Sequence, residues 1–79
     1  MYHKAYIVNN INNNMINTKI ITNAIEKSKT GLSITDLVNK TPLSRGQIRT
    51  TLAFLLGAEL IVERQTGMAK LYFLSEDLE

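Results

Sequence analysis

The chain has 79 residues, a formal net charge of +2 and no cysteine. This length accommodates one domain with a thin hydrophobic core, and the lack of cysteine excludes disulfides and thiolate metal sites. No apolar run reaches the ~18 residues of a membrane span, and the N-terminus lacks the basic-then-apolar order of a secretion signal, so we expect a soluble cytoplasmic protein.

The chain divides into a leader at residues 1–14, a domain at residues 15–75 and an acidic tail at residues 76–79. Asparagine is abundant at the end of the leader, where its side chain competes with the backbone for hydrogen bonds. That composition is typical of a linker or of the entry to a helix.

The first helix is expected to begin at Asn14 or Asn17 and to run to about Lys29, ahead of a stop at Gly31. Its apolar residues cover roughly half of the helix circumference; these are Ile16, Ile20, Ile21, Ala24 and Ile25. So wide a face favours contact with a second copy of the chain, although a helix enclosed by its own domain has the same pattern. The residues predicted at a dimer interface are Tyr6, Ile16, Ile20 and Ile21.

A second helix is expected over residues 34–40, because Ser33 and Asp36 have the spacing of a capping box. Pro42 ends it, and Leu43 fills the turn with an apolar side chain. The third helix is expected from the N-cap Ser44 to about Ala58. The residues predicted to face inward from these two helices are Ile34, Leu37, Val38, Ile48, Leu52 and Leu55.

After the third helix the apolar period changes from 3.6 to 2, which predicts strands at residues 60–65 and 69–74. The connection is expected over residues 65–68, where Gly67 can adopt the positive φ of a hairpin turn. Tyr72 is expected in the core, and Phe54 is expected to pack on the hairpin or on a partner helix. The predicted fold class is therefore mainly α with a small β-hairpin.

The order and spacing of these apolar and turn residues resemble the winged helix-turn-helix DNA-binding domains of the MarR, ArsR and TrmB type. The residues that carry the resemblance are Leu43-Ser44, Ile48, Leu52, Leu55, Leu60-Ile61, Gly67 and Tyr72-Phe73-Leu74-Ser75. The resemblance implies a recognition helix at residues 44–58 in the major groove and a wing at residues 64–70 on the minor groove or the phosphates. One departure is Glu59, which stands where such domains usually have glycine, so the exit of the third helix and the angle of the wing are expected to differ.

The side of the third helix opposite its apolar stripe carries groups suited to base reading, since arginine pairs with guanine and glutamine with adenine in a two-pronged fashion. The residues predicted to contact DNA are Ser44, Arg45, Gly46, Gln47, Arg49, Thr50 and Ala53 on the helix and Arg64, Gln65, Thr66 and Lys70 on the wing. Arg64 and Lys70 are expected to lie near each other across the hairpin. A solvated polar surface without function has the same composition.

The charge distribution favours a polyanion partner for the helical part of the chain. Residues 1–58 hold seven basic residues (Lys4, Lys19, Lys27, Lys29, Lys40, Arg45 and Arg49) and two acids (Glu26 and Asp36), whereas residues 59–79 hold Arg64 and Lys70 and five acids. Ordinary surface charge remains the alternative interpretation.

These patterns predict a sequence-specific double-stranded DNA-binding protein, namely a transcriptional regulator that binds a two-fold site as a homodimer and is nucleoid-associated if prokaryotic. A winged-helix protein-protein adaptor is an alternative, because fold does not fix function; plasmid or viral partition and replication are other DNA-binding roles. No nucleophile-and-base arrangement or phosphate-binding loop is visible, and the only histidine is His3, so we expect no enzyme activity, cofactor or metal site. The thin core leaves little room for a small-molecule ligand.

Overall fold

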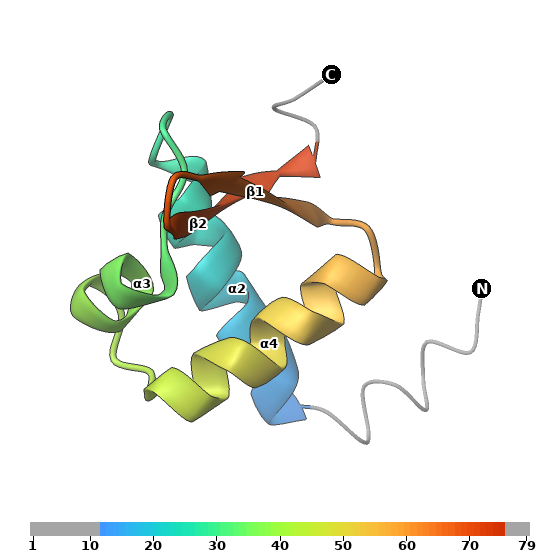
Figure 1. The fold of residues 1–79 in the computed structure, drawn as a ribbon. Helices are drawn as coiled ribbons and strands as arrows, with labels where there is room; N and C mark the ends of the chain where they lie inside the picture. The colour runs from blue at the N-terminus through green and yellow to red at the C-terminus, as the bar shows by residue number, and fades with distance from the viewer. Residues whose placement is uncertain (1–11, 76–79) are drawn as a thin grey trace.

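The computed structural model describes the backbone of residues 12–75 and the side chains of residues 15–75. This part of the chain forms three helices followed by a two-stranded antiparallel hairpin (Figure 1): α2 (Asn12–Glu26), α3 (Ile34–Lys40), α4 (Arg45–Gly57), β1 (Ile61–Thr66) and β2 (Ala69–Leu74). The predicted mainly α fold class is confirmed at this level. The predicted dimer residue Tyr6 lies outside the described residues.

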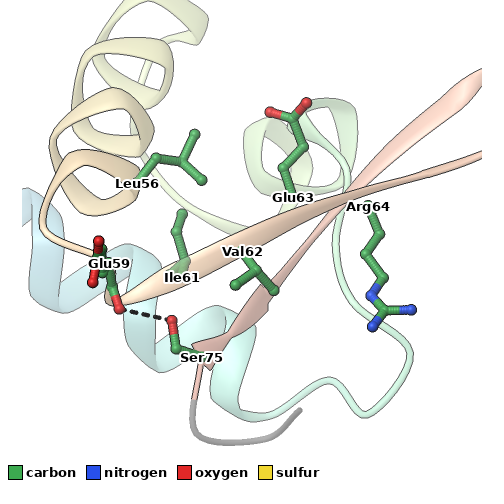
Figure 2. Close-up of a pocket in the computed structure, with 7 residues that line it drawn as sticks. All are labelled: Leu56, Glu59, Ile61, Val62, Glu63, Arg64 and Ser75. Atoms are coloured by element: carbon green, nitrogen blue, oxygen red, sulfur yellow. Dashed lines mark hydrogen bonds between the residues drawn. The ribbon is translucent and has the colours of Figure 1, made fainter. Parts of the chain in front are cut away.

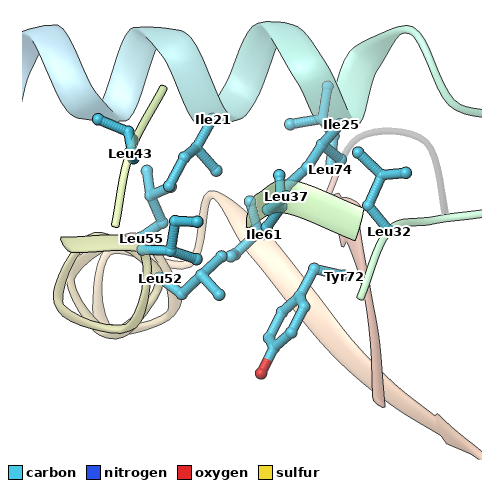
Figure 3. Packing of buried hydrophobic residues seen from close by; sticks show 11 residues of the cluster. Ile21, Ile25, Leu32, Leu37, Leu43, Leu52, Leu55, Ile61, Tyr72 and Leu74 are labelled. Atoms are coloured by element: carbon cyan, nitrogen blue, oxygen red, sulfur yellow. The ribbon is translucent and has the colours of Figure 1, made fainter. Parts of the chain in front are cut away.

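The core is formed by one cluster of apolar side chains to which all three helices and both strands contribute. In Figure 1, α4 crosses α2, α3 lies near the start of α4, and the hairpin passes over the C-terminal end of α2. Figure 3 shows most of the buried side chains, which are Ile21, Ile25, Leu32, Leu37, Leu43, Ile48, Leu52, Leu55, Ile61, Tyr72 and Leu74. The inward stripe predicted for α4 and the core position predicted for Tyr72 are therefore confirmed.

Capping boxes start both α3 and α4. At α3, the Ser33 Oγ atom accepts a hydrogen bond from the Asp36 amide at 3.1 Å, and the Asp36 Oδ2 atom accepts one from the Ser33 amide at 3.0 Å. These two bonds satisfy backbone donors that the helix itself leaves free. Because the cap and Pro42 bracket it so closely, α3 has the predicted bounds.

The first helix begins and ends earlier than predicted, because residues 27–31 form the connection that brings Leu32 to the sheet. Leu32 and Tyr72 exchange backbone hydrogen bonds of 3.2 and 2.8 Å, which add a single bridge on the outer side of β2. Gly31 has a φ of 82°, and a Cβ atom there would lie 2.6 Å from the Cζ atom of Phe73. Gly31 therefore allows the loop to pass close to the hairpin.

The exit of α4 is a tight turn in which Glu59 adopts a left-handed φ of 62°. Glu59 thus adopts a backbone region that a glycine would favour at lower cost, and the expected difference in helix exit and wing angle stays a prediction. The Ser75 hydroxyl donates to the Glu59 carbonyl oxygen at 2.8 Å (Figure 2), and the Leu60 amide donates to the Leu55 carbonyl at 3.0 Å. These bonds keep Leu60 in the turn, so β1 begins one residue later than predicted.

The hairpin pairs Ile61 with Leu74 at its base and Thr66 with Ala69 at its tip. This register leaves a loop of Gly67 and Met68 instead of the four-residue connection predicted. Gly67 has a φ of 63°, and a positive φ at the first loop residue alone is typical of a type II′ turn.

Candidate nucleic-acid interface

The outer face of α4 is a continuous polar surface on a rigid support. All seven helix residues predicted to contact DNA are exposed: Ser44, Arg45, Gly46, Gln47, Arg49, Thr50 and Ala53. On the opposite side, Ile48, Leu52 and Leu55 are buried in the core. A helix fixed by three buried aliphatic residues presents its outer side chains in a defined geometry, which recognition of a rigid partner requires.

Ser44 and Gln47 hold the start of α4 in a second capping box. The Ser44 Oγ atom accepts from the Gln47 amide at 3.1 Å, and the Gln47 Oε1 atom accepts from the Ser44 amide at 2.9 Å. The sequence analysis identified Ser44 as the cap but assigned Gln47 only to base reading. Two-pronged pairing with adenine uses the same Oε1 atom, so it would compete with the cap. The Ser-x-x-Gln spacing indicates a capping box and could have predicted this role of Gln47.

Thr51 is a buried polar residue of α4 that the sequence analysis did not assign. The Thr51 hydroxyl donates to the Gln47 carbonyl oxygen at 2.8 Å, and Thr51 is 2% exposed. The hydroxyl is therefore satisfied within the helix, and Thr51 belongs to the support of the surface.

The hairpin residues predicted to contact DNA are all exposed, but they lie on two faces. Gln65 pairs with Lys70, whereas Arg64 pairs with Leu71. Since paired residues share a face and successive residues alternate, Arg64 and Lys70 point to opposite sides. The expectation that these two cations lie near each other is therefore wrong.

Lys70 lies beside an acid that the sequence analysis did not single out. The Lys70 Nζ atom is 3.5 Å from the Glu63 Oε2 atom, with 57% and 35% of the two side chains exposed. Glu63 pairs directly with Tyr72 on the same hairpin face, and Figure 2 shows Glu63 and Arg64 pointing to opposite sides of β1. With the strand register known, Glu63 and Lys70 are diagonal cross-strand neighbours, so their ion pair could have been predicted from the register.

Tyr72 connects this hairpin face to α4. Figure 3 shows its ring among the core side chains with the hydroxyl pointing away from the aliphatic cluster. Burial raises the pKa of Tyr72 above its usual value of 10.0, and the negative charge of the Glu63 carboxylate raises it further. The positive charge of Arg49 acts on that pKa in the opposite direction. The hydroxyl therefore lies in the field of both Glu63 and Arg49.

The predicted dimer residues have different positions in the structure. Ile16 is 60% exposed, Ile20 is partly buried against the core, and Ile21 is 0% exposed. Ile21 is thus a core residue with no surface to offer a partner, because the wide apolar face of α2 packs on α4 and β2. Its assignment to a dimer interface is corrected to an assignment to the core.

An apolar groove lies between α2 and the C-terminal half of α4. Its lining residues are Met15, Thr18, Lys19, Thr22, Phe54, Leu55 and Leu60. Phe54 is 44% exposed within it. The Thr18 hydroxyl donates to the Met15 carbonyl at 2.7 Å and the Thr22 hydroxyl to the Lys19 carbonyl at 3.2 Å, so both hydroxyls are satisfied by their own helix.

Within residues 12–75, no group of three or more histidine, cysteine, aspartate or glutamate side chains is placed to hold a metal ion. No helix in this range is long and apolar enough to cross a membrane. Comparisons with protein-family models, with curated proteins and with solved structures found no match to this chain.

Proposed function

We propose that the protein binds double-stranded DNA in a sequence-specific manner as a winged helix-turn-helix transcriptional regulator, with α4 in the major groove and the hairpin as the wing. One observation carries the proposal: α4 exposes two arginines, a glycine and small methyl-bearing residues on one side, while its other side is anchored in the core. No acid occurs in α4. Such a helix can approach base edges without repelling phosphate.

Arg49 is the best candidate for base recognition, because it is exposed on α4 beside Gly46, Thr50 and Ala53 and its guanidinium can bond the O6 and N7 atoms of guanine together. The test begins with selection of a preferred duplex from a random pool, followed by fluorescence anisotropy on that duplex and on a random one. For Arg49→Ala, we expect a loss of about 1–3 kcal/mol of discrimination between the two duplexes.

Two control variants separate recognition from charge. Arg49→Lys keeps the charge but loses the planar two-pronged donor, so it should bind random DNA normally and still lose discrimination. Lys27→Ala removes an exposed cation just after the C-terminal end of α2 and should leave discrimination between the two duplexes unchanged. If no duplex is preferred over random DNA at moderate salt, or if Arg49→Ala behaves like Lys27→Ala, the proposal is rejected.

The homodimer forms part of the same proposal, and we assign its interface to the apolar groove between α2 and α4. One α4 reaches one half-site, whereas a two-fold operator presents two half-sites ~34 Å apart. The groove exposes large apolar side chains, since Met15 is 47% and Phe54 44% exposed. A second copy related by two-fold symmetry would cover these side chains with the same apolar surface of its own, as in an isologous interface.

Sedimentation of the full chain tests this interface. The wild type should sediment as a dimer, and Phe54→Arg should sediment as a monomer, because it places a second cation beside Lys19. Met68→Arg is the matched control, since Met68 is another exposed apolar residue but lies at the hairpin tip. A monomeric wild type, or a dimeric Phe54→Arg protein, would refute the interface.

A further inference from the structure

The face of the hairpin that carries Tyr72 has an unusual charge composition for a polyanion-binding surface. It contains Glu63, Gln65 and Lys70 outside the core, and Glu63 is the only acid in α4 or in either strand. An acid at this place opposes phosphate binding and therefore needs an explanation if the proposed function is correct.

The geometry around Glu63 supplies that explanation. Its carboxylate is 3.5 Å from the Lys70 ammonium, which is ion-pair distance but longer than the ~2.7–2.9 Å of a charge-assisted hydrogen bond to a phosphate oxygen. Both side chains remain partly exposed, so the ion pair is accessible to competing anions and to salt. In the free protein, Glu63 thus gives Lys70 an anionic partner with which a phosphate would have to compete.

The cross-strand register fixes this competition in place. Glu63 lies directly opposite Tyr72, which is buried and held by the Leu32 bridge. The backbone carrying Glu63 is therefore tied to the core, whereas Lys70 is closer to the tip. The acid is the positioned member of the pair, and the lysine is the member that can turn to another anion.

We propose that Glu63 is a specificity-determining residue that lowers the general attraction of this surface for polyanions by holding Lys70 in an ion pair. A DNA phosphate must displace the carboxylate to reach Lys70. The contact therefore forms readily only where base contacts by α4 already hold the duplex. This inference rests on the proposed DNA-binding function.

The test compares Glu63→Gln with the wild type on random duplex DNA across a salt series. Loss of a partly exposed ion pair should raise random-duplex affinity by about 1.4- to 5-fold at low salt. Release of Lys70 to a phosphate should steepen the salt dependence by about one unit. Discrimination between the preferred and the random duplex should fall, because the affinity for DNA of any sequence increases.

Glu59→Gln is the matched control, since it removes the same charge from an exposed residue that forms no ion pair within residues 15–75. It should change affinity and salt dependence less than Glu63→Gln. In a Lys70→Gln background, Glu63→Gln should have no more effect than Glu59→Gln, because the lysine that it would release is absent.

The outcomes distinguish the two proposals. If the wild type binds DNA and Glu63→Gln matches Glu59→Gln, or keeps its full effect without Lys70, the role of Glu63 is overturned and the DNA-binding function stands. If neither the wild type nor any variant binds duplex DNA at low salt, both are overturned.

Discussion

Gly46 gives the sharpest test of the α4 surface, because stability and DNA binding should respond to Gly46→Ala in opposite directions. Gly46 is helical and exposed, and a Cβ atom placed there has no neighbouring atom within 4 Å. The substitution therefore introduces no clash in the free protein. It removes the entropic cost of a helical glycine, which is about 0.5–1 kcal/mol.

For a domain of this size, each kcal/mol moves the melting temperature by about 4–8 °C, so Gly46→Ala should raise it by about 2–8 °C. In the complex, the added methyl group would fill the space into which the DNA edge must come. Overpacking of a close contact costs about 1–3 kcal/mol, which corresponds to an affinity loss of about 5- to 150-fold.

Gly57→Ala is the control in the same helix. Gly57 is also helical and exposed with no atom within 4 Å of a built Cβ, but it lies at the C-terminal end of α4. Thermal melts and anisotropy on the preferred duplex should show stabilisation for both variants and weaker binding for Gly46→Ala alone. Equal DNA affinity of the two variants would refute a close approach of DNA to the backbone at Gly46. A lower melting temperature for Gly46→Ala would contradict the open space around a Cβ atom at that position.

Three further predictions concern the support of the surface. Gly31→Ala forces a left-handed alanine against the Phe73 ring and should lower the free energy of unfolding by about 2–5 kcal/mol in urea titrations; Gly67→Ala, which has a positive φ but no atom within 4 Å, should cost less, and equal losses would show that the ring gives way freely. Ser44→Ala should cost about 1 kcal/mol through the lost cap, and an unchanged urea midpoint would contradict the capping role. The raised pKa of Tyr72 means that its contribution to stability is complete below pH ~10 and is lost as pH rises towards the folded-state pKa; the urea midpoint should therefore fall more between about pH 9 and about pH 11 for the wild type than for Tyr72→Phe, and parallel falls would contradict this.

The elements that the sequence predicted most accurately are those bounded by local chemistry. The bounds of α3 follow from a capping box and a proline, and the exposed face of α4 follows from its aliphatic stripe. Local signals of this kind do not depend on the rest of the chain. The extent of β2 was predicted for the same reason, by alternation after a turn glycine.

The errors concern long-range contacts. The strand register places Arg64 and Lys70 on opposite faces, and a shift of one residue reverses such an assignment. The bridge between Leu32 and Tyr72 joins segments far apart in the chain, and no local pattern indicates it. Ile21 was assigned to an interface because helix periodicity shows how wide an apolar face is, but does not show how many neighbours within the domain cover it.

The hairpin tip also provides a site for chemical labelling. Met68 is 100% exposed, and the chain contains no cysteine, so Met68→Cys would create a single, fully accessible thiol at the hairpin tip. A cleavage reagent attached there would cut only the nucleotides close to the hairpin tip, and a fluorophore would report only on binding near it. The orientation of bound DNA in the proposed complex could then be mapped nucleotide by nucleotide without altering α4.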